Sequence, residues 1–454
     1  MKKLILSSLL IIATTIISCN DDEGNISSES ETAIFTVSIE NIAPEKTFVK
    51  SGVFNIPVDN LGPGAATPGN RFEFIIDAGR SHNLSFATML AATNDLFFAP
   101  DEEGIALYDG NGHPISGDVT NQIYLWDAGT ELNEEPAVGP NTVTNQTARN
   151  TGEDENGTVR KIEDIDTDTF DYPPVNEIVN VSIAHAGGTR FKVTIEDLST
   201  ALLKTSEGER PAPISPGVWV VYNSNVPNPL FIENQHDLGQ GIESIAEDGN
   251  PDILGEHVLG NTGVTYPASP GGWIVHQQGT KPFFTEGLDD YNDGIEAIAE
   301  DGSAVNLEMA LSSLSGFKDG DIFDTPVGNS VPGAILPGNQ FQFSFEASIG
   351  DQLSLATMLA ATNDIFFGTA DTGIPLFNTN GEPIGGDITN QVYLWDAGTE
   401  VNEEPAIGPN TVTNQLAPNT GTDQDEPVYL LNDVNDGFDY PTVNNVLKVT
   451  ISVN

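Results

Sequence analysis

The sequence predicts an all-β protein with two tandem antiparallel β-sandwich domains and a few short helices. Short segments such as Phe72–Ile76 and Phe341–Phe345 alternate apolar and polar residues, as half-buried strands do. Glycine and proline, 45 and 29 residues of 454, separate many short segments of this kind. A long internal repeat then divides the chain into two similar parts. Many short strands between turns are typical of a sandwich in each part.

The repeat is the clearest feature of the chain. Residues 72–152 match residues 341–421 at a constant offset of 269. Tyr124-Leu-Trp-Asp-Ala-Gly-Thr-Glu131, for example, returns as Tyr393-Leu-Trp-Asp-Ala-Gly-Thr-Glu400. We therefore expect two homologous domains, residues 33–185 and 190–454, joined near 186–188.

A second, shorter duplication lies inside the longer half. Residues 214–257 resemble residues 268–311, each with a Ser-Pro-Gly-x-Trp strand and an Ala-Glu-Asp-Gly segment. Residues 33–185 contain no such segment, so the first domain is predicted to be a shortened version of the second. In the later copy, Asp293 and Gly302 are suited to cap a short helix.

The N-terminus has the features of a bacterial lipoprotein signal. Lys2 and Lys3 precede an apolar stretch, residues 4–17, that is short for a membrane span. Cys19, the only cysteine, follows it after one small residue, Ser18. We expect a signal peptide at 1–18, lipidation of Cys19, and an acidic flexible tether at 19–32. This predicts a lipid-anchored protein of the outer membrane of a Gram-negative bacterium, on the cell surface or facing the periplasm.

The charge balance excludes one large class of partners. Sixteen Lys and Arg stand against 67 Asp and Glu, a net charge of −51. Binding to nucleic acid depends on cationic side chains at phosphates, so we expect none. An excess of carboxylates instead suits a soluble secreted protein or one that binds cations. Motifs of serine hydrolases, zinc proteases and phosphate-binding loops are absent from the sequence.

Repeated acidic residues predict a cation site in each half. Asn94-Asp95 and Asn363-Asp364 follow an apolar strand, and Asp-Ala-Gly-Thr-Glu closes a later one. The glycine allows a sharp bend that can bring the two acids of this motif together. Close carboxylates without Lys or Arg repel one another unless a cation is bound. Ligation by oxygen alone favours Ca²⁺, since Zn²⁺ prefers His or Cys.

These motifs resemble the spondin domain, which also occurs in animal F-spondin and mindin. The resemblance rests on the Ser-Phe/Leu-Ala-Thr-Met strand, the loop Asp followed by aromatics, and Trp-Asp-Ala-Gly-Thr. It implies C2-like sandwiches with one calcium site per domain. The ligands that it implies are Asp95, Asp127, Glu131, Asp364, Asp396 and Glu400. Asp118 and Asp387 recur between them and are expected only to shape a turn.

Three functions are compatible with these features. The first is a non-enzymatic, calcium-stabilised surface protein that binds an extracellular glycan, matrix or cell-surface ligand, as the spondin resemblance implies for adhesion. The second is a calcium-dependent extracellular hydrolase of polysaccharide or lipid. The third is a structural stalk in which calcium only rigidifies the domains.

Overall fold

The computed structural model describes residues 32–165 and 169–454. It confirms an all-β fold of sandwich type with a few short helices. The predicted signal peptide, Cys19 and nearly all of the tether lie outside the described residues. Within the described part of the chain, no helix is long and apolar enough to cross a membrane.

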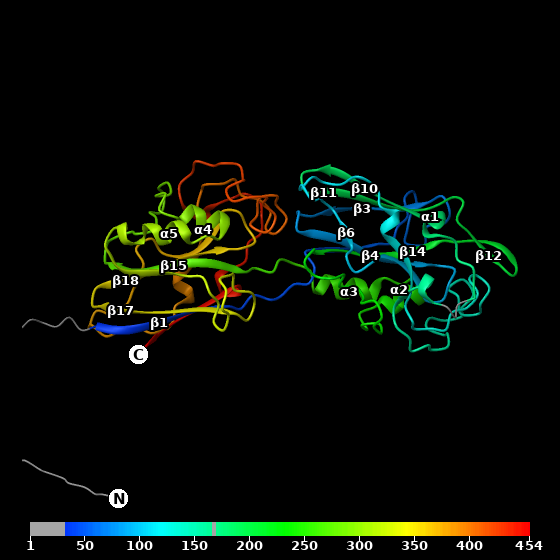
Figure 1. Cartoon of the computed structure of the whole chain (residues 1–454), viewed down its shortest axis with the longest axis horizontal. Helices are drawn as coiled ribbons and strands as arrows, with labels where there is room; N and C mark the ends of the chain where they lie inside the picture. Colours follow the sequence, from blue (N-terminus) through cyan, green and yellow to red (C-terminus); the bar gives the residue numbers. More distant parts are fainter. Residues whose placement is uncertain (1–31, 166–168) are drawn as a thin grey trace, which may run out of the picture.

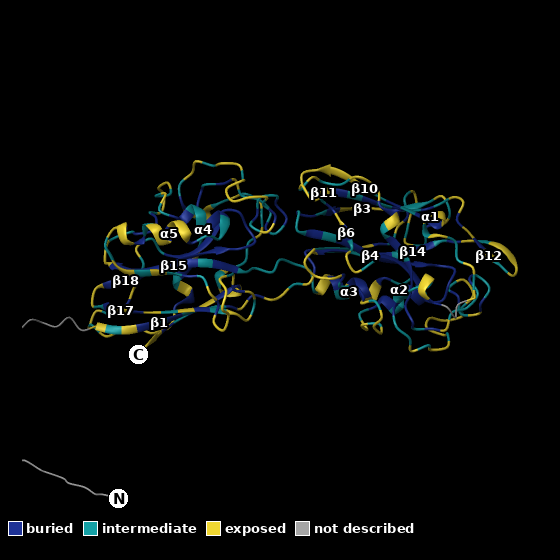
Figure 2. Ribbon diagram, viewed as in Figure 1, coloured by how far each residue is buried: buried dark blue, intermediate teal, exposed yellow. Residues whose placement is uncertain are grey.

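Each domain consists of three layers (Figure 1). A four-stranded sheet packs on one face of a seven-stranded sheet, and two short helices cover the other face. The middle sheet is therefore covered on both sides. This is why β18 (Asp351–Leu359) is buried at every position, and β4 (His82–Leu90) at all but one (Figure 2). Apolar residues on both faces of these strands follow from that burial.

The two domains are nested in the chain. The inserted domain spans residues 48–262, and the outer domain consists of residues 32–43 and 266–454. Phe48 pairs in parallel with Thr262 where the chain enters and leaves the inserted domain. Lys46 and Thr265 in the two connections are hydrogen-bonded, with the Lys46 amide donating to Thr265 Oγ1 at 2.8 Å.

Among the described residues, the inserted domain contains eleven strands in the two sheets of the sandwich, a separate hairpin of two strands and three α-helices. Its four-stranded sheet has the order β3-β11-β10-β7, and its seven-stranded sheet runs β2-β14-β4-β5-β8-β9 with β6 beside β4. The bounds not yet given are β2 (Lys50–Phe54), β3 (Arg71–Asp77), β5 (Leu96–Pro100), β6 (Ile105–Ala106), β7 (Gly117–Asp118), β8 (Ile123–Asp127), β9 (Arg160–Lys161), α1 (Val175–Ile178), β10 (Val179–Gly187), β11 (Arg190–Asp197), β12 (Leu202–Thr205), β13 (Gly208–Pro211), β14 (Ile214–Asn223), α2 (Ile242–Asp248) and α3 (Asp252–Gly260).

The outer domain repeats this topology. Its sheets have the orders β17-β1-β24-β21 and β16-β15-β18-β19-β22-β23, with β20 beside β18. The bounds are β1 (Thr32–Asn41), β15 (Ala268–Gln277), α4 (Ile295–Asp301), α5 (Val305–Ala310), β16 (Phe317–Phe323), β17 (Gln340–Ser348), β19 (Ile365–Thr369), β20 (Ile374–Pro375), β21 (Gly386–Asp387), β22 (Val392–Asp396), β23 (Tyr429–Leu430) and β24 (Leu447–Val453). Helix α4 ends at Gly302 in the left-handed conformation, as predicted, but its N-cap is Gly294 rather than Asp293.

The domain boundaries expected from the repeat are wrong in two respects. Strand β1 does not join residues 48–185 but pairs with β17 and β24 of the outer domain. Residues 190–260, assigned by the repeat to the second domain, complete the first one through β11, β14, α2 and α3. Each domain thus contains one copy of the duplicated segment, and neither is shortened. The physical reason is local, since β10 and β11 form a hairpin and stay together.

A loop of the outer domain docks on the inserted domain. Asn414 Oδ1 accepts hydrogen bonds from the Ser81 amide at 2.9 Å and the Ser81 hydroxyl at 2.7 Å. Arg80 Nη1 donates to the carbonyl oxygens of Pro409 and Asn414 at 2.6 and 3.1 Å. Ile407, 1 % exposed, belongs to the core of the inserted domain. The domains are therefore joined by buried contacts as well as by two connections.

The equivalent loop of the inserted domain has the same shape but no such partner. Asn145 makes the same three hydrogen bonds within its loop as Asn414 does, to the counterparts of Ala406 O, Gly408 O and Thr411 Oγ1. Its side chain is exposed, whereas Asn414 is 2 % exposed. Comparing Asn145 with Asn414 therefore separates the stability that comes from the loop itself from the stability that comes from the contact between domains.

We expect Asn414→Ala to destabilise the protein more than Asn145→Ala does, by about 1–3 kcal/mol, because only Asn414 also accepts two hydrogen bonds across the interface. Chemical denaturation would measure the difference. Limited proteolysis at residues 44–47 and 263–265 would show whether the domains have separated. Equal effects of the two substitutions would contradict a stabilising role of this contact.

Candidate metal centre

Two elements position the acidic residues in each domain. In the inserted domain, Asp95 ends the turn between β4 and β5, and Asp127 is the last residue of β8. Leu96 pairs with Asp127 across the sheet, which brings the two carboxylates to the same end of neighbouring strands. A third segment, residues 152–158, returns along this end and contributes Glu155. The predicted proximity of Asp95 and Asp127 is therefore found in the structure.

Asp95, Asp127 and Glu155 form a cluster that fits a cation. One carboxylate oxygen of each lies within 4.8 Å of the others. Asp95 and Asp127 are 0 and 1 % exposed. Among the described residues, Asp95 Oδ1 has no hydrogen-bond partner although it is fully buried. A buried, unpaired carboxylate oxygen is costly, and a bound cation would remove that cost.

The remaining oxygens are held by the surrounding loop. Asp95 Oδ2 accepts from the amides of Thr130 and Glu131 at 3.3 and 3.1 Å. Asp127 Oδ1 accepts from the Gly129 amide at 2.6 Å, and Asp127 Oδ2 from Asn133 Nδ2 at 2.7 Å. These bonds fix both carboxylates so that their free lone pairs converge.

Gly129 makes this loop possible. Its φ of +68° lies in the left-handed region, and a Cβ would lie 2.6 Å from the Thr158 amide nitrogen. The glycine of Asp-Ala-Gly-Thr-Glu therefore permits both the bend and the close approach of residues 157–158. That approach places Glu155 beside the two aspartates.

The electrostatics of the cluster are those of crowded, buried acids. Burial and then the Asp127 charge raise the pKa of Asp95 well above its ordinary value. Burial raises the pKa of Asp127 to about 6, although hydrogen bonds from Gly129 and Asn133 oppose this. The only positive group paired with the cluster in the described structure is Arg160, 3.6 Å from Glu155. The cluster therefore needs protons or a cation to balance its charge.

The outer domain holds a related but poorer cluster. Asp364 Oδ2 accepts from the amides of Thr399 and Glu400, and Asp396 from Gly398 and Asn402, as in the first copy. Here, however, Asp364 Oδ1 accepts from Thr399 Oγ1 at 2.9 Å. Gln424 stands where Glu155 does, since both amides bond the same carbonyl of the loop. This site offers one carboxylate fewer.

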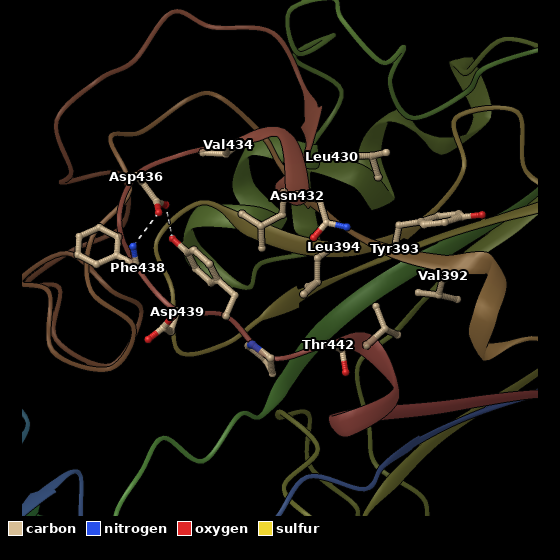
Figure 3. Close-up of a pocket in the computed structure, with 14 residues that line it drawn as sticks. Val392, Tyr393, Leu394, Leu430, Asn432, Val434, Asp436, Phe438, Asp439 and Thr442 are labelled. Atoms are coloured by element: carbon tan, nitrogen blue, oxygen red, sulfur yellow. Dashed lines mark hydrogen bonds between the residues drawn. The ribbon is translucent and has the colours of Figure 1, made fainter.

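A further acid lies close to this second site, beside a cleft of about 400 Å³ at the edge formed by β22 and β23 (Figure 3). The Asp436 carboxylate accepts from the Tyr440 hydroxyl at 2.6 Å and from the Phe438 amide at 2.9 Å. Its charge contributes to raising the pKa of Asp396, after burial, the largest cause. Asp436 thus lies near the second site, but both of its carboxylate oxygens already accept hydrogen bonds.

Glu131 and Glu400 have a different place from the one predicted. Glu131 Oε1 accepts from the Gly152 amide at 2.7 Å, and Oε2 from Asn94 Nδ2 at 3.3 Å. Glu400 makes the equivalent bonds to Gly421 and Asn363. The converging acid in the inserted domain is Glu155 instead. Each glutamate thus links the turn before the loop Asp to the later segment that begins at Gly152 or Gly421.

Two buried glutamates lie near the two clusters, and two repeated aspartates lie in exposed turns. Glu247 on α2 and Glu300 on α4, both 3 % exposed, lie beside Glu131 and Glu400, and burial raises the pKa of each to about 8. The repeated Ala-Glu-Asp-Gly segment was the available signal for them. Asp118 and Asp387 accept from the amides of Thr120 and Thr389 and are exposed, which confirms that they shape a turn.

The inserted domain also has a cleft beside its cluster. A hollow of about 350 Å³ is lined by Asp127, Leu132, Asn133, Glu155, Ile165, Thr169 and Phe170. Two of the three clustered acids thus face an opening with partly apolar walls. No known protein-family model matches this chain, and no curated protein matches it either.

Glu131→Gln separates the two roles considered for this residue. Glutamine keeps only one accepting oxygen, so the hydrogen bond from either Gly152 or Asn94 is lost. We expect a loss of about 1–3 kcal/mol of stability. If Glu131 only supports the loop, the loss is the same in calcium and in EDTA. A loss seen only in calcium would instead make Glu131 a ligand. Thermal unfolding under both conditions measures this.

Proposed function

We propose that this chain is a calcium-binding, non-catalytic lipoprotein of the spondin type that binds a ligand outside the cell. In this proposal Cys19 is lipidated and anchors the protein to the outer membrane. The inserted domain is the ligand-binding end, and the outer domain connects it to the anchor. The observation that carries the proposal is the cluster of Asp95, Asp127 and Glu155 beside an open cleft.

The choice of calcium follows from the donors. The cluster provides carboxylate oxygens, with Asn133 Oδ1 as a further buried oxygen without a partner in the described structure. Hard oxygen donors of this kind suit Ca²⁺, which takes about six to eight oxygens in flexible geometry. The calcium would balance the buried charge and hold the loop of residues 127–133 in place. Positions not filled by the protein would be open to a ligand in the cleft.

The nesting of the domains supports this orientation. Strand β1 begins at Thr32, which pairs with Ser348, and runs toward the inserted domain. The start of β1 therefore lies at the end of the outer domain that is distant from the inserted domain (Figure 1). An anchor at residue 19 would place the outer domain near the membrane and the inserted domain away from it.

The charge of the site indicates the ligand class. Three carboxylates and one Ca²⁺ leave a charge of about −1 in a chain of net charge −51. Anionic ligands are disfavoured in this field, whereas neutral hydroxyl oxygens can ligate calcium at no such cost. Aliphatic side chains and Phe170 in the cleft can contact the apolar faces of a sugar ring. We therefore propose a neutral extracellular glycan, free or on a matrix or cell-surface protein.

Calcium should stabilise the folded protein. For residues 20–454, we expect a clear rise in melting temperature on replacing EDTA with calcium, since binding to the folded state alone contributes about 2.7 kcal/mol at a hundredfold excess over Kd. Asp127→Ala and Asp396→Ala should each reduce the rise. An unchanged melting temperature in the parent protein would contradict calcium binding.

A reciprocal exchange provides the matched control. Glu155→Gln gives the inserted domain the residue of the outer domain, and Gln424→Glu does the reverse. Calcium titration by calorimetry should show weaker binding after the first change and tighter binding of the second site after the other. If neither affinity changed, residue 155 would not be a ligand.

Ligand binding should depend on the same site. On an array of neutral glycans, we expect binding in calcium that is lost in EDTA and strongly reduced by Glu155→Gln, because the cation would bridge ligand and protein. Asp396→Ala, in the other domain, is the control and should retain binding. Normal calcium binding without any bound glycan would overturn the ligand class and leave the calcium site standing.

A further inference from the structure

Asp197 is a buried acid of the four-stranded sheet and is not part of the candidate metal centre. It is the last residue of β11 and is 0 % exposed. Within the described part of the chain, neither of its carboxylate oxygens has a hydrogen-bond partner. A carboxylate in this state would carry an uncompensated buried charge, which proteins rarely tolerate.

The other domain shows what this pocket requires. The counterpart of Asp197 is Asn41, at the end of β1, which is also 0 % exposed. Asn41 Nδ2 donates to the carbonyl oxygens of Tyr266 and Ile335, both at 2.9 Å. Its Oδ1 accepts from the Ala43 amide at 2.9 Å. The pocket therefore presents two acceptors to whichever side chain occupies it.

The backbone around the two residues is the same. Asp197 O accepts from the Gly69 amide at 2.8 Å, and Asn41 O from Gly338 at 2.8 Å. The amide of each residue donates to Asn70 O or Asn339 O at 2.9 Å. The carbonyls facing Asn41 correspond to those of Ala212 and Ala66, which take the same places beside Ile214. An acid thus stands where the fold provides partners for a donor.

We propose that Asp197 is held in the folded protein as a neutral carboxylic acid whose O–H donates to one of these carbonyl oxygens, Ala66 O or Ala212 O. The carboxylic proton of Asp197 would donate to a carbonyl oxygen, as the side-chain amide of Asn41 does in the outer domain. The inserted domain, unlike the outer one, consequently loses stability when this proton is lost.

The electrostatics agree with this geometry. Burial, and to a smaller extent the Glu196 charge, raise the pKa of Asp197 to about 8. An exposed Asp in the unfolded chain has a pKa of about 3.9. Because the folded value is the higher one, the stabilisation is complete below about pH 4. It is lost as the pH rises to about 8, by up to tenfold in the unfolding equilibrium constant per pH unit.

Other charged groups near Asp197 lie toward solvent. Glu196 precedes it and pairs in register with Arg71 on β3. Glu177 on α1 and Arg210 on β13 belong to the other segments packed nearby, and both reach the surface. Of these groups only Glu196 affects the pKa of Asp197, and it favours the neutral form.

The test is Asp197→Asn in the whole mature chain, at fixed calcium concentration and between pH 4.5 and 8.5. We expect the variant to raise the melting temperature of the inserted domain at pH 8.5 and to change it little at pH 4.5. Hydrogen exchange read on peptides of β11 should slow at high pH, whereas peptides of β1 should not change.

Asn41→Asp is the reciprocal control. It should destabilise the outer domain increasingly as the pH rises and speed exchange in β1 alone. Glu196→Gln should lower the pKa of Asp197 slightly and leave the pH dependence in place. A gain from Asp197→Asn that is the same at both pH values, or no gain, would overturn the proposal. So would stability that follows the concentration of Na⁺, K⁺ or Ca²⁺ at Asp197 instead of pH, because the pocket would then hold a cation.

Discussion

The hairpin of β10 and β11 determines how the whole chain is divided. Gly187 and Gly188 both have positive φ values, which permit a tight reversal between two long strands. Once β11 is paired with β10 and β3, it fills the place in the four-stranded sheet that β1 occupies in the other domain. Strand β1 is left without a partner among residues 48–262. It pairs instead with β17 and β24, which lie hundreds of residues further along the chain, and this completes the outer domain with the inserted one between its two chain segments.

This constraint explains which parts of the fold could be predicted from sequence. The repeat at offset 269 and the duplicated helix segment correctly predict which residues are equivalent, and the alternation of residues predicts the sheets. The equivalence of two segments does not indicate which of the two strands, β1 or β11, pairs with the other strands of each domain. Phe35 and Phe191 occupy the same position in their strands, and either could fill the same core. Only the short connection next to β11 distinguishes them, so the domain boundaries required the structure.

The candidate metal centre could likewise be predicted from sequence only in part. Asp95, Asp127 and their counterparts were predictable because turn and strand end recur together in both copies. Glu155 was not, since its counterpart is Gln424 and an irregular return segment places it. The spondin resemblance implies Glu131 as a ligand, yet its side chain reaches Gly152, where a Cβ would lie 2.1 Å from the glutamate carboxyl carbon. The absence of a side chain at Gly152 thus leaves room for the Glu131 carboxylate in this position.

The two copies have also diverged where the domains meet. Gly79 lies against Asn414, and a Cβ there would be 2.2 Å from the Asn414 amide nitrogen. The equivalent residue of the outer domain is Ser348, and Ile349 replaces Arg80, the donor to two carbonyls of the docked loop. The exposed loop of Asn145 could therefore not dock on an outer domain in the same way, because Ser348 would clash and the arginine would be absent. The end of the inserted domain that carries Asp127 and Glu155 is therefore not covered by such a contact, and the cleft beside these two acids is open.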